Sequence, residues 1–154
     1  MDEGAGAPAP DSPSELKARA LRYLVRREHS RAELERKLAP HAASPADLQA
    51  VLDALLSRKQ LSDERFAEER ARVLSRKYGA ARIAHDLRAR GVAEDVIRKL
   101  PAGGELERAK AILARKYRGA ACTPEERAKR MRFLQSRGFS YDTIRAALSS
   151  TDTV

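Results

Sequence analysis

The chain has 154 residues, of which 42% are hydrophobic and 5% aromatic, with no tryptophan, so it can build one ordinary domain or a string of small units around aliphatic side chains. Its 31 Lys and Arg outnumber its 22 Asp and Glu, and a net charge of +9 favours polyanions or acidic protein surfaces as partners. One cysteine excludes an internal disulfide framework, and no apolar run approaches the roughly 20 residues of a membrane span, so we expect a cytoplasmic protein.

The N-terminal part predicts a tail followed by three helices. Residues 1–13 are rich in Ala and Pro, and we expect them to be disordered. Residues 14–60 form the first predicted repeat. Each of its helices begins after a serine that can cap it, namely Ser12, Ser30 and Ser44. Apolar residues recur there at helical spacing, for instance Leu48, Val51, Leu52, Leu55 and Leu56.

Two further groups of three helices follow, in residues 61–102 and 103–150. Ser62 is expected to cap a helix that runs through Tyr78 and is broken by Gly79. The segment RGVAEDVIR at 90–98 aligns with RGFSYDTIR, 47 positions later. In both copies the glycine is placed as a left-handed C-cap, which predicts that Val92 packs on Leu87 and Phe139 on Leu134. The fold class is therefore all-α: three tandem three-helix repeats forming an elongated, curved rod.

No group of residues predicts catalysis. The three histidines, His29, His41 and His85, are scattered, lack metal-ligand spacing and are expected at the surface or at helix ends. Cys122 has no evident histidine partner, and Gly103-Gly104 is a linker without a phosphate-binding lysine. We expect no cofactor, no metal and no enzymatic activity.

The positive charge is concentrated beyond residue 60. Residues 1–60 hold 10 basic and 9 acidic side chains, whereas residues 61–154 hold 21 and 13. We expect the near-neutral first repeat to serve protein contacts or folding. Cations at helix ends and in i,i+4 pairs, such as Glu68 with Arg72, account for part of this excess. The remainder predicts a basic binding face with these candidate residues: Arg70, Arg72, Arg76, Lys77, Arg82, Arg88, Arg115, Lys116, Arg118, Lys129, Arg130 and Arg132.

The few aromatic residues mostly fall on apolar stripes, where core packing is the default. Tyr141 and Phe133 are the two expected to be partly exposed. Single-strand stacking platforms need exposed rings beside a basic groove. The composition therefore disfavours base stacking as the main source of affinity.

A series of motifs across residues 14–150 resembles one family. In chain order they are ALRYL at 20–24, RREHS at 26–30, LSDERFA at 61–67, YG at 78–79, RGV at 90–92 and RGFS at 137–140. Their order resembles the RecX regulatory proteins, bacterial modulators of the RecA recombinase. The resemblance implies an all-helical, non-catalytic protein that acts in recombination, DNA repair and the SOS response, and we expect it to be a monomer. It also implies binding to RecA nucleoprotein filaments, inhibition of their ATPase and strand exchange, and contact with single- and double-stranded DNA.

Two other functions compete with this interpretation. The first is a sequence-nonspecific nucleic-acid-binding protein without a RecA role, which would bind bare DNA as well as RecA-coated strands. The second is a small enzyme, which would need a pocket with convergent polar groups.

Overall fold

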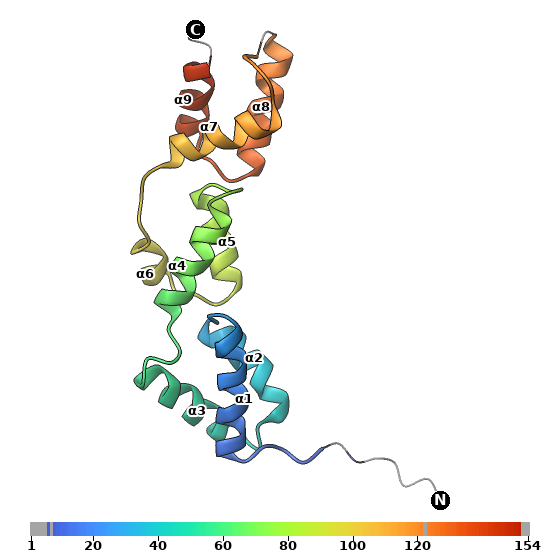
Figure 1. The fold of residues 1–154 in the computed structure, drawn as a ribbon, viewed down its shortest axis with the longest axis vertical. Coiled ribbons are helices and arrows are strands. Elements are labelled where there is room, and N and C mark those ends of the chain that lie inside the picture. Colours follow the sequence, from blue (N-terminus) through green and yellow to red (C-terminus); the bar gives the residue numbers. More distant parts are fainter. Residues whose placement is uncertain (1–5, 7, 122, 152–154) are drawn as a thin grey trace, which may run out of the picture. The chain divides into compact units, whose positions relative to one another are not determined.

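All secondary structure of the described residues is helical. The computed structural model describes residues 6, 8–121 and 123–151, in which it shows nine α-helices, one 3-10 turn and no strand (Figure 1). The helices are α1 (Pro13–Arg26), α2 (Arg31–Leu38), α3 (Pro45–Ser57), α4 (Asp63–Leu74), α5 (Ala80–Ala89), α6 (Glu94–Arg98), α7 (Glu105–Lys116), α8 (Pro124–Ser136) and α9 (Tyr141–Thr151), with the 3-10 turn at Ala39–His41. The predicted all-α class is confirmed. Cys122 and parts of the predicted tail, residues 1–5 and 7, lie outside the described residues.

The N-caps expected from the sequence are confirmed. The Ser12 hydroxyl accepts from the Glu15 backbone N–H at 3.2 Å, and the Glu15 carboxylate accepts from the Ser12 N–H at 3.2 Å. This reciprocal pair satisfies two backbone donors that the first turn of a helix otherwise leaves open, and each such cap contributes about 1 kcal/mol. Side-chain caps also begin α2, α3, α4 and α8, at Ser30, Ser44, Ser62 and Thr123 respectively.

The chain divides into two compact units, residues 1–66 and 67–154, with the division inside α4. In the first unit, α1, α2 and α3 bury one leucine-rich core. The helix residues of this core with no exposed surface are Leu16, Ala20, Leu34, Leu38, Leu52 and Leu55. They fall at the helical spacing of the apolar residues, so the pattern in the sequence already predicts which face of each helix is buried.

The end of the predicted tail is ordered. The Asp11 backbone N–H donates to the His41 carbonyl at 2.8 Å, and Arg19 Nε donates to the Asp11 carboxylate at 2.7 Å. The Arg19 guanidinium lowers the pKa of Asp11 through this hydrogen bond. The prediction of disorder through residue 13 is therefore wrong at Asp11, because α1 and the 3-10 turn both bind it.

His29 lies at the helix ends between α1 and α2, but it is buried, so a surface position is wrong for it. The residue is 1% exposed, and its ring centroid lies 6.0 Å from that of Tyr23. Nδ1 lies 3.0 Å from the Arg27 carbonyl and Nε2 lies 2.8 Å from Lys37 Nζ. Because an ammonium can only donate, Nε2 accepts and Nδ1–H donates, which defines a neutral imidazole. Burial is the main cause that lowers the pKa of His29, and the positive charges of Arg27 and Lys37 lower it further.

We expect the stability of the first unit to fall as the pH drops below about 6.5, the ordinary pKa of histidine. The unfolded chain then binds a proton on His29, while the folded chain keeps the ring neutral against Lys37 until a lower pH. The loss can reach about 1.4 kcal/mol per pH unit in this window. Hydrogen exchange of α1 and α2 amides between pH 5 and 7 measures it. His29→Gln should flatten the dependence, whereas His85→Gln, at an exposed histidine, should leave it unchanged.

The second unit contains the two glycine turns expected from the internal repeat. Gly91 has φ +83° and Gly138 has φ +90°, the left-handed region that favours glycine. The N–H groups of Val92 and Phe139 donate to the carbonyls of Leu87 and Leu134 at 3.0 and 3.2 Å. Both turns therefore have the predicted C-cap geometry. Phe139 and Leu134 belong to the core of α7, α8 and α9, whose other buried members are Ala109, Ile112, Leu113, Ile144, Ala147 and Leu148.

Gly79 has a different role from the one predicted. α4 ends at Leu74, short of Tyr78, and the residues from there to Gly79 form a turn, called the 75–79 turn below. Gly79 has φ −85°, which any residue can adopt. A Cβ there would lie 2.5 Å from the Gly138 carbonyl oxygen, and the Gly79 N–H donates to the Arg137 carbonyl at 2.8 Å. Glycine is needed because two turns 59 positions apart in the sequence touch through their backbones.

Candidate functional site

Some cations of the second unit are neutralised by acidic side chains. Arg70 holds both carboxylate oxygens of Asp86, at 2.9 and 3.1 Å, and its hydrogen bond lowers the pKa of Asp86. Arg88 is paired with Glu94. Arg72 is paired with Glu69 at 3.6 Å, rather than with Glu68 as predicted. The other pairs are Arg90 with Asp86, Arg108 with Glu105 and Lys110 with Glu107.

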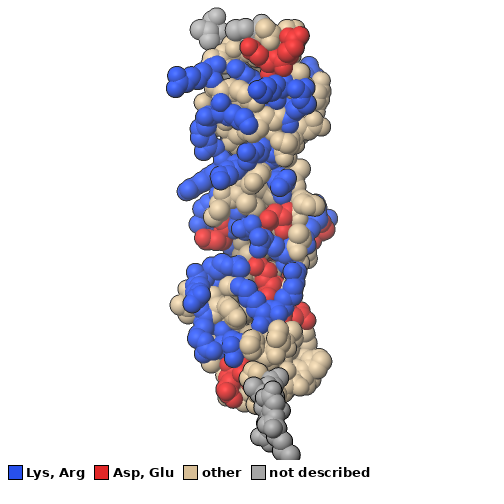
Figure 2. Space-filling view, turned by 90° about the vertical axis from the view of Figure 1, so that its right-hand side faces the viewer, with Lys and Arg blue, Asp and Glu red and all other residues tan. Residues whose placement is uncertain are grey.

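A second set of cations has no such partner. Within the described ranges, no carboxylate lies at ion-pair distance from Arg76, Lys77, Arg82, Arg115, Lys116 or Arg137. Lysine and arginine side chains predominate over acidic ones on the face of this unit shown in Figure 2. An unneutralised cluster concentrates positive potential, and it is this set rather than the total charge that can attract an anion.

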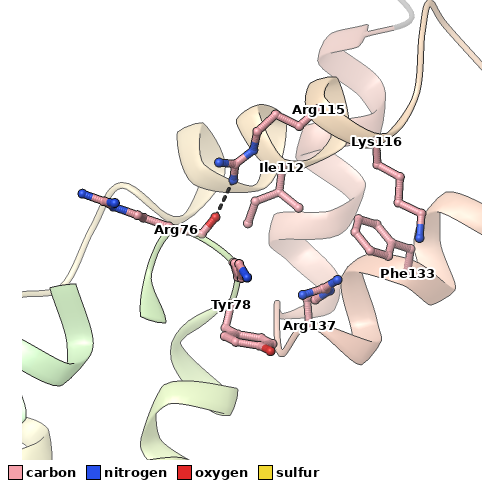
Figure 3. A pocket seen from close by; sticks show the side chains of 8 residues that line it. Arg76, Tyr78, Ile112, Arg115, Lys116, Phe133 and Arg137 are labelled. Atoms are coloured by element: carbon pink, nitrogen blue, oxygen red, sulfur yellow. Dashed lines mark hydrogen bonds between the residues drawn. The ribbon is translucent and has the colours of Figure 1, made fainter. Parts of the chain in front are cut away.

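Backbone carbonyls of the 75–79 turn hold this turn against α7. Arg108 donates through Nε to the Ser75 carbonyl at 3.2 Å and through Nη2 to the Tyr78 carbonyl at 2.9 Å. Arg115 donates to the carbonyl of Arg76 (Figure 3). These contacts satisfy turn carbonyls that no helix pairs, and they fix the place from which Arg76 and Lys77 project.

The turn, the end of α7 and the end of α8 line an open pocket of about 570 Å³, called the basic pocket below. Its lining is Arg76, Lys77, Tyr78, Ile112, Arg115, Lys116, Phe133 and Arg137. Figure 3 shows that the labelled side chains come from these separate segments and that the Arg76 side chain extends away from the others. Five of the eight lining residues are cations and none is acidic, so the pocket is suited to an anion.

The aromatic rings of the pocket alternate with its cations. The Arg137 guanidinium lies 5.3 Å from the Tyr78 ring centroid and 5.1 Å from that of Phe133. Arg82 also lies over Tyr78, at 5.2 Å, and Lys116 Nζ lies 4.2 Å from the Phe133 centroid. Each cation–π contact contributes about 0.5–2 kcal/mol. The rings therefore hold neighbouring like charges in fixed positions.

The structure sorts the twelve predicted binding residues by environment. Arg76, Lys77, Arg115 and Lys116 meet in the basic pocket, although the sequence separates the two pairs by 38 positions or more. Arg82 lies beside the pocket on Tyr78. The residues paired with acids are Arg70, Arg72 and Arg88. Those exposed outside the pocket are Arg118, Lys129 and Arg132.

Arg130 is buried rather than displayed. It is 7% exposed, its Nη1 donates to the Gly119 carbonyl at 2.8 Å, and its guanidinium lies 4.9 Å from the Tyr117 centroid. It joins α8 to the loop that follows α7. The prediction that Arg130 is a surface binding residue is therefore wrong, because its side chain forms contacts inside the fold.

The candidates from the sequence omitted some residues that the structure brings forward. Arg137 belongs to the basic pocket, and its position after α8 and before Gly138 looks like an ordinary helix end in the sequence. In the first unit, α1 presents Arg19, Arg22 and Arg26 around Tyr23, which together line a shallow pocket. Their spacing of three and four residues places them on one helix face. Arg19 is paired with Asp11 at 2.7 Å, so Arg22 and Arg26 provide the local positive charge that the near-neutral total of this unit hides.

No described helix is long and apolar enough to cross a membrane. The described residues also hold no group of three or more His, Cys, Asp or Glu side chains placed to bind a metal ion.

Comparison with known proteins gives three matches to models of one family. They are described as the first, second and third three-helix domains of RecX, and they match residues 17–55, 62–100 and 104–148. A regulatory protein RecX from Herbaspirillum seropedicae is 46% identical over 92% of this chain and 94% of its own length. One from Ralstonia nicotianae is 41% identical, with 94% and 93% covered. The crystal structure of RecX from Lactobacillus salivarius superposes with a TM-score of 0.81 at 21% identity, covering 92% of this chain and 97% of its own, which shows the same fold.

Proposed function

The chain belongs to the RecX family of regulatory proteins, and from that premise we propose that it binds RecA filaments on DNA and lowers their ATPase and strand-exchange activity. It acts in this proposal without catalysis of its own, as a monomer in the cytoplasm, during recombination and repair. The basic pocket is the observation that carries the proposal, because its five cations lack acidic partners among the described residues.

A nucleoprotein filament offers both anionic phosphates and protein surface. The basic pocket supplies charge for the phosphates, and Arg22 and Arg26 of α1 supply a separate, smaller basic surface in the first unit. Contacts that are weak alone reinforce each other when one chain makes them together, because the second contact forms at a high effective concentration. This combination favours RecA-coated DNA over either component alone.

The test is the DNA-dependent ATP hydrolysis of RecA, measured on single-stranded DNA with increasing amounts of the protein. We expect hydrolysis to fall at or below one protein per RecA subunit, and the inhibition to weaken as salt screens the cations. Bovine serum albumin at equal mass controls for crowding. Unchanged hydrolysis at a stoichiometric amount of protein would rule the proposal out.

A second function rests on the same pocket: a sequence-nonspecific nucleic-acid-binding protein without a RecA role. It needs only the unpaired cations. The two functions separate in one binding assay that compares bare with RecA-coated single strands at the same salt concentration. A preference for the coated strand supports the RecA regulator, and equal or tighter binding to bare DNA supports the alternative.

A further inference from the structure

A lysine and a histidine of the first unit are joined by a hydrogen bond. Lys37 Nζ donates to Nε2 of His29 at 2.8 Å, and Nδ1–H of the same ring donates to the Arg27 carbonyl at 3.0 Å. His29 is buried, whereas Lys37 is only half-buried and retains exposed surface. A reagent in solution can therefore reach the amine of Lys37, while the ring beside it is shielded from that reagent.

The surroundings of Lys37 favour the neutral, nucleophilic form of its amine. Burial is the main cause that lowers the pKa of Lys37, and the positive charges of Arg27 and Arg26 act in the same direction. Glu33 opposes them, although it is itself paired with Arg27 at 2.9 Å. The Tyr23 ring, whose centroid lies 4.9 Å from Nζ, holds the side chain in place. At neutral pH the neutral fraction of this amine therefore exceeds that of an ordinary lysine.

His29 is placed to accept the proton that this amine loses when it reacts. Burial and the charges of Arg27 and Lys37 lower the pKa of His29, so the ring is neutral and its Nε2 lone pair faces Nζ. The Arg27 carbonyl fixes the tautomer and remains a partner for Nδ1–H when the ring takes up a proton. A nucleophile, a base within hydrogen-bond reach and a group that orients the base are the parts of an activated nucleophile.

The charge of the nearby surface selects the class of reagent. Arg22 and Arg26 are exposed on α1, and both line the shallow pocket that also includes Tyr23. Among the described residues, no carboxylate lies at ion-pair distance from either of them. Their charge attracts a reagent that carries an anionic group. An acyl phosphate is such a reagent, and its phosphate is also a good leaving group.

We propose that Lys37 is a site of covalent acylation by small acyl phosphates, with His29 as the proton acceptor. The Lys37 ammonium first loses one proton to water. The nitrogen lone pair then attacks the carbonyl carbon, an N–C bond forms, and the C–O bond to phosphate breaks with its electron pair staying on the phosphate. The second proton passes from Nζ to His29 Nε2 and on to the departing phosphate. The products are a neutral amide and hydrogen phosphate.

The experiment treats the full chain with acetyl phosphate and follows the acetylation of each lysine over time by peptide mapping and mass spectrometry. Lys99 is the internal control, because it is more exposed than Lys37 and stands beside Arg98, where an anionic reagent also meets positive charge. We expect Lys37 to react about tenfold faster than Lys99 at neutral pH. An equal or slower reaction of Lys37 would overturn the proposal.

His29→Gln tests the proton acceptor. The glutamine amide oxygen can still accept a hydrogen bond from Lys37, but it cannot take up the proton. We expect the acetylation of Lys37 to slow about tenfold and that of Lys99 to stay unchanged. Circular dichroism verifies that the variant is folded. An unchanged rate at Lys37 in the folded variant would refute the role of His29.

The pH profile of the unsubstituted chain is a second test, which needs no variant. A more acidic ammonium becomes neutral at a lower pH, so the ratio of the Lys37 rate to the Lys99 rate should fall as the pH approaches about 10.4, the ordinary pKa of lysine. A constant ratio would mean that the two amines are equally acidic and would overturn the proposal. The rate at Lys37 should also fall with added salt, because salt screens the attraction of the anionic reagent. A rate independent of salt would refute the assignment of the reagent class.

Acetylation has a consequence within the first unit. The amide N–H can still donate to His29 Nε2, but the positive charge of Lys37 is gone, so the pKa of His29 moves back toward its ordinary value. The loss of stability below about pH 6.5 should therefore be smaller in the acetylated protein, as measured by hydrogen exchange of α1 and α2. The inference goes beyond the proposed function, and none of these measurements involves RecA or DNA, so the two can fail separately.

Discussion

Replacement of Gly138 by alanine is expected to lower the free energy of unfolding of the second unit by about 3–4 kcal/mol. The residue has φ +90°, which alone costs about 1 kcal/mol for alanine. The new Cβ would also lie 2.4 Å from Arg82 Cβ and 2.6 Å from the Arg82 backbone nitrogen. These atoms belong to α5 and cannot yield without separating it from the turn after α8. Urea unfolding followed by circular dichroism measures the loss, and hydrogen exchange assigns it to the second unit.

Gly103→Ala is the matched control for this substitution. Gly103 also has a positive φ, +109°, but a Cβ there meets no atom within 4 Å. Its replacement therefore costs only the strain of a side chain on a left-handed backbone, about 1 kcal/mol. If Gly138→Ala cost no more than Gly103→Ala, the close approach of the two turns would not contribute to stability.

Replacement of Arg108 by alanine is expected to cost about 2–3 kcal/mol. The side chain is half-buried and donates to the Ser75 and Tyr78 carbonyls, while Glu105, its ion-pair partner, accepts from the Ala80 N–H at 3.0 Å. Truncation leaves the two carbonyls of the 75–79 turn without their donor in a partly buried place. Thermal unfolding followed by circular dichroism measures the effect.

Lys110→Ala controls for the loss of one cation from α7. Lys110 is paired with Glu107 at 3.6 Å near the surface, and we expect its removal to cost less than about 0.5 kcal/mol. Arg108→Ala should in addition weaken single-strand binding, although Arg108 does not line the basic pocket, since it holds the turn that presents Arg76 and Lys77. Unchanged binding in a folded Arg108→Ala protein would show that the turn keeps its place without this clamp.

Part of the candidate site was predictable and part was not. The sequence singled out the Arg-Lys pairs at 76–77 and 115–116, because both stand near helix ends in the basic part of the chain. It could not separate them from Arg70 and Arg88, which have similar surroundings in the sequence but are paired with Asp86 and Glu94 in the fold. Whether a cation is neutralised depends on side chains from another helix or turn. The net charge of a segment does not show which cations have such a partner.

Burial of polar side chains was equally beyond the sequence. His29 lies in the short link between α1 and α2, where helical periodicity gives no inward face, and it is covered by Tyr23 and Lys37. Arg130 follows the spacing of an ordinary helix surface, yet its donors reach the Gly119 carbonyl. The boundaries expected for the three repeats stay a prediction.

The sequence by itself determined the features that depend on neighbours along the chain. Serine caps, apolar stripes and the glycine turns at Gly91 and Gly138 follow from hydrogen bonds and packing within about seven residues, so local chemistry specifies them. The tertiary structure alone decided the rest: the need for glycine at Gly79, the neutralised cations and the assembly of the basic pocket. These depend on distances between residues far apart in the sequence, which are set only when the helices pack.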